Sequence, residues 1–142
     1  MKSNMGQLEE QVLQMLLAGD DPALVTLRYQ LELAKRSARE YTGVGFFTHF
    51  DVPQEVPRLS GNPSIKFGDV IAEMDGLQRG AGFLLFIENG ALSMLEGYTY
   101  EEPWPQKVAR FELSYTSGTT RDLSALRKTI GWPDQEERNE MQ

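Results

Sequence analysis

The stretch FLLFIENGALSMLEGYTY, residues 83–100, decides the fold of this chain. Two apolar runs are separated by Asn89 and Gly90, the pair that a type I′ turn selects because both of its central residues need positive φ. The pattern predicts a β-hairpin, and its two-residue loop sets the register. The predicted pairs are Glu88 with Ala91, Ile87 with Leu92, Phe86 with Ser93, Leu85 with Met94, Leu84 with Leu95 and Phe83 with Glu96.

Both faces of the predicted hairpin are largely apolar. Antiparallel sheets often leave one face to water, and their strands then alternate apolar and polar residues. We therefore expect this hairpin to lie in the centre of a sheet, covered by helices, by a curled sheet or by another subunit. One face would carry Phe83, Leu85, Ile87, Leu92 and Met94, and the other Leu84, Phe86, Ser93 and Leu95.

Two amphipathic helices are predicted before the first strand. Apolar residues recur at helical spacing over residues 7–18, and Gly19 follows. Asp21 is a predicted N-cap with Pro22 at the first helical position, so a second helix should run to about Glu40. Its expected inward residues are Leu24, Leu27, Leu31, Ala34 and Ala38. On its outer side Glu32 precedes Arg36 by four residues, the favourable order for a helical ion pair.

Period-two alternation predicts strands in the rest of the chain. The first strand spans residues 44–52, and a breaker-rich loop follows over 53–64. A strand over 65–74 is interrupted at Gly68 and Asp69, which indicates a bulge. After the hairpin, residues 108–116 predict a last strand, and a helix over 120–130 would begin at a capping-box pattern of Thr119 and Asp122.

These elements predict a single α+β domain over residues 1–142. Its antiparallel sheet of about five strands would be packed by the N-terminal helices, with a short C-terminal helix. Residues 134–142 are polar and predicted to be a disordered tail. The order of elements is shared by many folds and does not fix a function.

Composition excludes several classes of function. The chain has 142 residues and no cysteine, which excludes disulfides, thiolate nucleophiles and cysteine-ligated metals. We expect no metal, no cofactor, no membrane span and a cytoplasmic location. The formal charge of −7 argues against nucleic acid as a partner. Residues 41–106 carry nine acidic and three basic side chains, so most of this excess lies on the predicted sheet and its loops. Solubility alone also explains such a charge.

The leading hypothesis is a non-enzymatic binding protein, with a homodimer as one possibility. Its site would be an acidic aromatic surface that engages a basic protein, as an inhibitor or immunity protein does. The alternative for this segment is that Trp104 caps the core and the glutamates lie in solvent. The predicted binding residues are Tyr98, Tyr100, Glu101, Glu102 and Trp104.

A competing hypothesis is a small-ligand-binding or hydrolytic domain with a pocket between helices and sheet. Its polar groups would be His49, Asp51 and Glu96, with His49 and Asp51 at i and i+2 on one strand. Each of these groups also has a simpler explanation. His49 would be a surface or half-buried histidine beside a polar neighbour, and Glu96 would be a carboxylate in water at the end of the hairpin. A third possibility is a structural subunit with a large dry interface on the second hairpin face.

Overall fold

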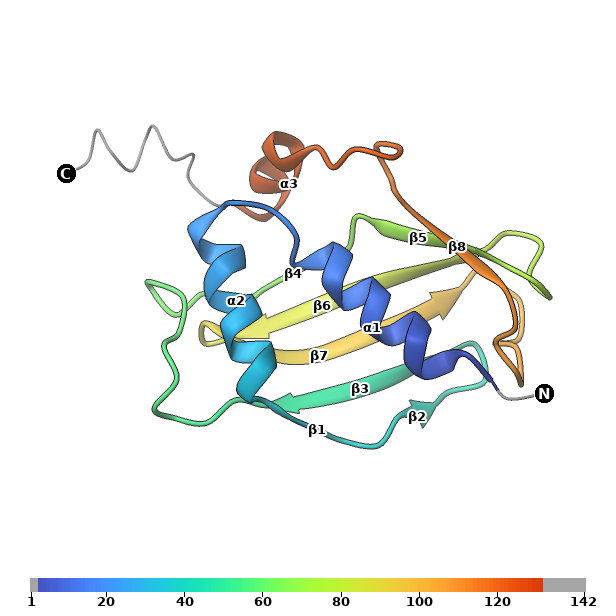
Figure 1. Ribbon diagram of the computed structural model, residues 1–142, viewed down its shortest axis with the longest axis horizontal. Coiled ribbons are helices and arrows are strands. Elements are labelled where there is room, and N and C mark those ends of the chain that lie inside the picture. The colour runs from blue at the N-terminus through green and yellow to red at the C-terminus, as the bar shows by residue number, and fades with distance from the viewer. Residues whose placement is uncertain (1–2, 132–142) are drawn as a thin grey trace.

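A computed structural model describes residues 3–131 of the chain and has the predicted α+β architecture. Two helices precede an antiparallel sheet and a third, short helix follows it. Figure 1 shows α1 and α2 lying over the same face of the sheet. The predicted tail over 134–142 lies outside the described residues.

The helices are α1 (Met5–Leu16), α2 (Pro22–Leu33) and α3 (Leu123–Ile130). The strands are β1 (Lys35–Arg36), β2 (Glu40–Tyr41), β3 (Gly45–Asp51), β4 (Ile65–Phe67), β5 (Val70–Met74), β6 (Ala81–Glu88), β7 (Ala91–Thr99) and β8 (Phe111–Tyr115).

Eight strands form the sheet. Six of them are neighbours in the order β1-β3-β7-β6-β5-β8. Two short strands lie off this path: β2 also pairs with β3, and β4 also pairs with β6. The strands therefore occupy six positions, close to the predicted five. The expected interruption at Gly68 and Asp69 is the break between β4 and β5. All the pairs are antiparallel.

The predicted hairpin is β6 and β7, and it lies in the centre of the sheet between β3 and β5. Asn89 and Gly90 both have positive φ, 51° and 78°, as a type I′ turn requires. The pairs next to the turn have the predicted register, but the register shifts beyond Ile87, so that Phe86 pairs with Met94 rather than Ser93. One extra residue in β7 therefore moves its remaining side chains to the opposite face from the one predicted.

This shift decides which residues form the core. Leu95 is buried on the helix-covered face, where the predicted register had placed Met94. Gly97 lies on the same face, and a Cβ there would come within 2.2 Å of the Phe46 ring. A glycine at this position thus lets Phe46 pack flat across the middle of the sheet. The core also contains Leu8, Val12, Leu16, Leu24, Leu27, Phe83, Leu85 and Ile87.

The prediction that α2 continues to Glu40 was wrong. The helix ends at Leu33, and Ala34 is extended with φ −71° and ψ 145°. The chain then runs along β3 as the edge strands β1 and β2, which satisfies backbone groups that the sheet edge would leave open. The predicted pair of Glu32 and Arg36 is accordingly absent. Arg36 contacts α1 instead, and the predicted core residue Ala38 is exposed.

The other predicted boundaries differ by a few residues. Asp21 does cap α2, because its side chain accepts a hydrogen bond from the Ala23 N–H at 2.9 Å. Asp122 caps α3, while the Thr119 capping box does not form because the helix begins three residues later than predicted. Within residues 3–131, no helix is long and apolar enough to cross a membrane.

Candidate protein-binding face

The helices cover only one face of the sheet, and we call the opposite side the open face. In each strand the residues that alternate with the buried core positions point to this side. Cross-strand register then aligns them in rows. One row contains Glu40, Phe47, Glu96 and Leu84, and the next contains His49, Met94, Phe86 and Lys66.

The centre of the open face is apolar and half-buried. Its side chains lie outside the core cluster and pack against one another across β3, β7 and β6. Water therefore reaches an apolar surface that no element among residues 3–131 covers, and such a surface is typical of a binding site. These residues are Phe47, Leu84, Phe86, Met94 and Tyr98.

Acidic side chains lie within and around this apolar centre, with Glu96 between Phe47 and Leu84. The strands place six carboxylates and two lysines on the open face, and four of these carboxylates belong to the acidic segment of residues 41–106. The carboxylates are Glu40, Asp51, Glu73, Glu88, Glu96 and Glu112, and the lysines are Lys35 and Lys66. This arrangement favours a partner with basic groups around an apolar contact.

A groove of about 740 Å³ lies at one end of the open face, between β5, β8 and the end of β7. Its lining includes Tyr100 after β7, Ile71 and Glu73 from β5, and Glu112 from β8. Gly80, just before β6, also lines the groove; its φ is positive, 71°, and a Cβ there would come within 2.4 Å of the Ala72 carbonyl oxygen. We call this feature the Tyr100 groove.

Tyr98 and Tyr100, two of the predicted binding residues, lie together beside the Tyr100 groove. Their rings meet edge to face with centroids 5.6 Å apart. Tyr98 lies across Gly82, where a Cβ would come within 2.5 Å of its hydroxyl oxygen. Burial, the hydrogen bond with Tyr100 and the negative charge of Glu96 raise the pKa of Tyr98 to about 12. Tyr98 is thus a neutral, positioned ring, while Tyr100 is 41% exposed.

Glu101 and Glu102 differ in what they can offer a partner. Glu101 is exposed and has a positive φ of 62°. Glu102 accepts hydrogen bonds from the backbone N–H groups of Gln78 and Arg79, at 2.8 and 2.9 Å. These two donors lower the pKa of Glu102 below its ordinary value. Glu102 therefore holds the loop after β5 against the turn that carries Tyr100.

Trp104, the last predicted binding residue, is buried at the end of the core. It is 7% exposed, and its ring meets Phe46 edge to face at 5.2 Å. This matches the alternative in which Trp104 caps the core. Its indole N–H has no hydrogen-bond partner in the described part of the chain.

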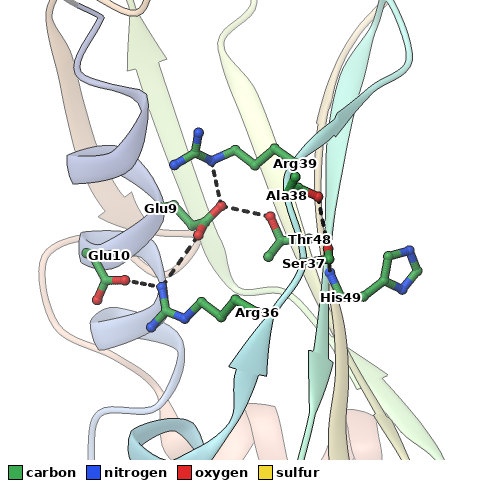
Figure 2. Close-up of polar contacts among 8 residues, drawn as sticks. All are labelled: Glu9, Glu10, Arg36, Ser37, Ala38, Arg39, Thr48 and His49. Carbon is green, nitrogen blue, oxygen red and sulfur yellow. Dashed lines mark hydrogen bonds and ion pairs between the residues drawn. The ribbon is translucent and has the colours of Figure 1, made fainter.

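The alternative trio of His49, Asp51 and Glu96 shares the open face. His49 and Asp51 are exposed on β3, and Glu96 lies one row away beside Phe47. Figure 2 shows the imidazole of His49 pointing away from α1. The three side chains are thus on the side opposite the helices, and not between helices and sheet, where the hydrolytic hypothesis placed its pocket.

A charge cluster centred on the buried Glu9 lies between α1 and β3 and was not predicted. Glu9 accepts hydrogen bonds from Arg39 at 2.9 Å and from the Thr48 hydroxyl at 2.8 Å, and it lies 3.5 Å from Arg36 (Figure 2). Arg36 also pairs with Glu10. Burial opposes the charge of Arg39, but the hydrogen bond and charge of Glu9 outweigh it and raise the Arg39 pKa. Because every charge is paired, this cluster fixes α1 to the edge strands.

One sequence signal could have located this cluster. Glu9 is four residues after Met5 and three before Val12, and both of these residues are buried. A carboxylate at an inward helical position requires a cation nearby.

No group of three or more potential metal ligands is placed to hold an ion within residues 3–131. Comparisons of the chain with protein-family models, curated proteins and solved structures find no match. The geometry and charge of the open face are therefore the observations from which a function is proposed.

Proposed function

We propose that this chain is a non-enzymatic interaction protein that binds a basic protein through the open face of its sheet. An inhibitor or immunity protein for a basic enzyme is one class with this charge relationship. The observation that carries the proposal is the coincidence of an apolar centre and an acidic surround on the face without helices. Protein interfaces commonly combine an apolar core with a polar rim, and complementary charge supplies specificity and rapid association.

The location of the proposed surface differs in part from the segment predicted from sequence. Tyr98 and Tyr100 belong to it, whereas Trp104 lies in the core and Glu102 is occupied by backbone N–H groups. Carboxylates that are distant in sequence, such as Glu40 and Asp51, extend it across the sheet.

The test compares two charge-reversed variants in affinity capture from the native cell. Glu40→Lys with Asp51→Lys reverses two exposed carboxylates on the open face. Asp20→Lys with Glu32→Lys makes the same change in charge at exposed positions of the helical layer. We expect a basic protein to be retained by the unchanged chain and by the Asp20/Glu32 variant, and to be lost with the Glu40/Asp51 variant.

A second measurement is the salt dependence of binding between this chain and the captured protein, once that protein has been purified. Binding should weaken as salt rises, because exposed charges are screened over about 8 Å at physiological ionic strength. Equal capture by both variants, or loss from both, would reject the open face as the site.

A further inference from the structure

We propose that the Tyr100 groove receives an arginine side chain of the basic partner. This inference rests on the proposed function and names the chemistry that the same face recognises. The groove is the part of the open face where the ring of Tyr100, the apolar side chain of Ile71 and the carboxylates of Glu73 and Glu112 line one hollow.

The carboxylate wall is an unusual pairing. Glu73 and Glu112 lie directly opposite each other on β5 and β8, and both are exposed. Side chains in such a pair have Cβ atoms about 5 Å apart, and like charges at this separation are destabilising. Neither carboxylate has an ion-pair partner in the described part of the chain. A cation placed between them would remove the repulsion.

The two arginines that also line the groove do not fill this role. Arg110 lies 3.6 Å from Asp75, at the rim. The charge of Arg79 acts on Glu102, whose pKa it helps to lower. The cation that Glu73 and Glu112 lack would therefore come from outside the chain.

The aromatic wall favours a guanidinium over an ammonium group. Tyr100 lines the groove and is 41% exposed, and its ring packs edge to face against Tyr98. A planar guanidinium can stack on a tyrosine ring while its fork of donors reaches two carboxylates, whereas the ammonium of a lysine is a compact and strongly hydrated charge. The groove thus discriminates between two side chains of equal charge.

The walls of the groove are held in place by the chain itself. Glu102 anchors the backbone of Gln78 and Arg79 to the turn after Tyr100. The hydroxyl of Thr99, which has one proton, shares it between the carbonyls of Val44 and Glu102. A site preformed in this way loses little entropy when the arginine enters.

The test uses fluorescein-labelled hexa-arginine and hexa-lysine peptides and fluorescence anisotropy at low salt. We expect the unchanged chain to bind hexa-arginine more tightly than hexa-lysine, by about three-fold. Tyr100→Ala should remove this preference, while Tyr29→Ala, a change at an exposed tyrosine of α2, should keep it.

A second pair of variants tests the carboxylates. Glu73→Gln with Glu112→Gln should weaken hexa-arginine binding by about five-fold. Glu32→Gln with Glu55→Gln, which removes the same charge at exposed positions, should leave it within about two-fold.

The outcomes separate this inference from the proposed function. Equal affinity for the two peptides, or a preference for hexa-arginine that survives Tyr100→Ala, would overturn the arginine groove. In that case the capture experiment with Glu40 and Asp51, which lie outside the groove, still decides whether the open face binds a basic protein.

Discussion

The side chain of Gln30 on α2 completes the hydrogen bonding of Leu92 on β7. Its Oε1 accepts from the Leu92 backbone N–H at 2.9 Å, and its Nε2 donates to the carbonyls of Gly90 and Pro57 at 3.0 and 2.9 Å. Gln30 is completely buried. One amide thus joins the second helix, the central hairpin and the long loop of residues 53–64, all on the helix-covered side of the molecule.

Gln30→Leu is expected to destabilise the fold. The substitution replaces the amide with an apolar side chain of similar size and leaves the buried Leu92 N–H without an acceptor, at a cost of about 1–3 kcal/mol. Urea unfolding followed by circular dichroism measures the change. Gln14→Leu, at an exposed position of α1, should change the free energy of unfolding by less than about 0.5 kcal/mol. An equal loss in both variants would contradict the assigned role of Gln30.

Glu9→Leu should also destabilise the chain, because it leaves Arg36 and Arg39 without their buried partner. The expected loss is about 2–3 kcal/mol, less than for a fully buried pair, because about 30% of each arginine side chain is exposed. Glu10→Leu removes the half-exposed carboxylate on the same arginine and should cost under about 1 kcal/mol. The same urea experiment compares the free energies of unfolding of the two variants. A larger decrease in the Glu10 variant would show that Glu9 is not the main partner of the arginines.

Local sequence signals predicted the elements of this fold well. The Asn89–Gly90 turn, the Asp21 cap and the period-two strands all follow from backbone preferences that act over a few residues. The hairpin register beyond Ile87 did not follow from them, because the turn sets only the pairs next to it and an extra residue in β7 shifts the rest. The prediction of where α2 ends failed because long-range pairing also decides it. After Leu33 the chain pairs with β3, and this pairing overrides the helical periodicity.

The candidate site was predictable only in part. Tyr98 and Tyr100 stand in one short segment, and their combination of aromatic and acidic neighbours was visible in the sequence. Glu73 and Glu112 are 39 positions apart and become neighbours only through the pairing of β5 with β8. Strand order cannot be obtained from alternation, so neither the carboxylate pair nor the Tyr100 groove could be found before the structure.

Tyr98 should give a titration step near pH 12. Its pKa is raised above the ordinary value of 10, so the folded chain holds this proton more tightly than the unfolded chain does. The stability that Tyr98 contributes is therefore present below pH 10 and is lost as the pH rises from about 10 to about 12. Tyrosinate absorbance at 295 nm measures the step. It should disappear in Tyr98→Phe and remain in Tyr29→Phe, and a step that survives Tyr98→Phe would assign it to another group.

Glu102 should titrate at a lower pH in the folded chain than in the chain unfolded in urea. The N–H groups of Gln78 and Arg79 bind the charged carboxylate and lower its pKa from the ordinary 4.5. The contribution of Glu102 to stability is then present above pH 4.5 and is lost as the pH falls through its folded pKa. The amide proton shifts of residues 78 and 79 report this event directly by NMR, because both donors lose a charged acceptor on protonation.

In Glu102→Gln this titration should vanish, while Glu101→Gln, a neutralisation at the exposed adjacent position, should preserve it. Amide shifts that still titrate in the Glu102 variant would mean that another carboxylate binds the loop.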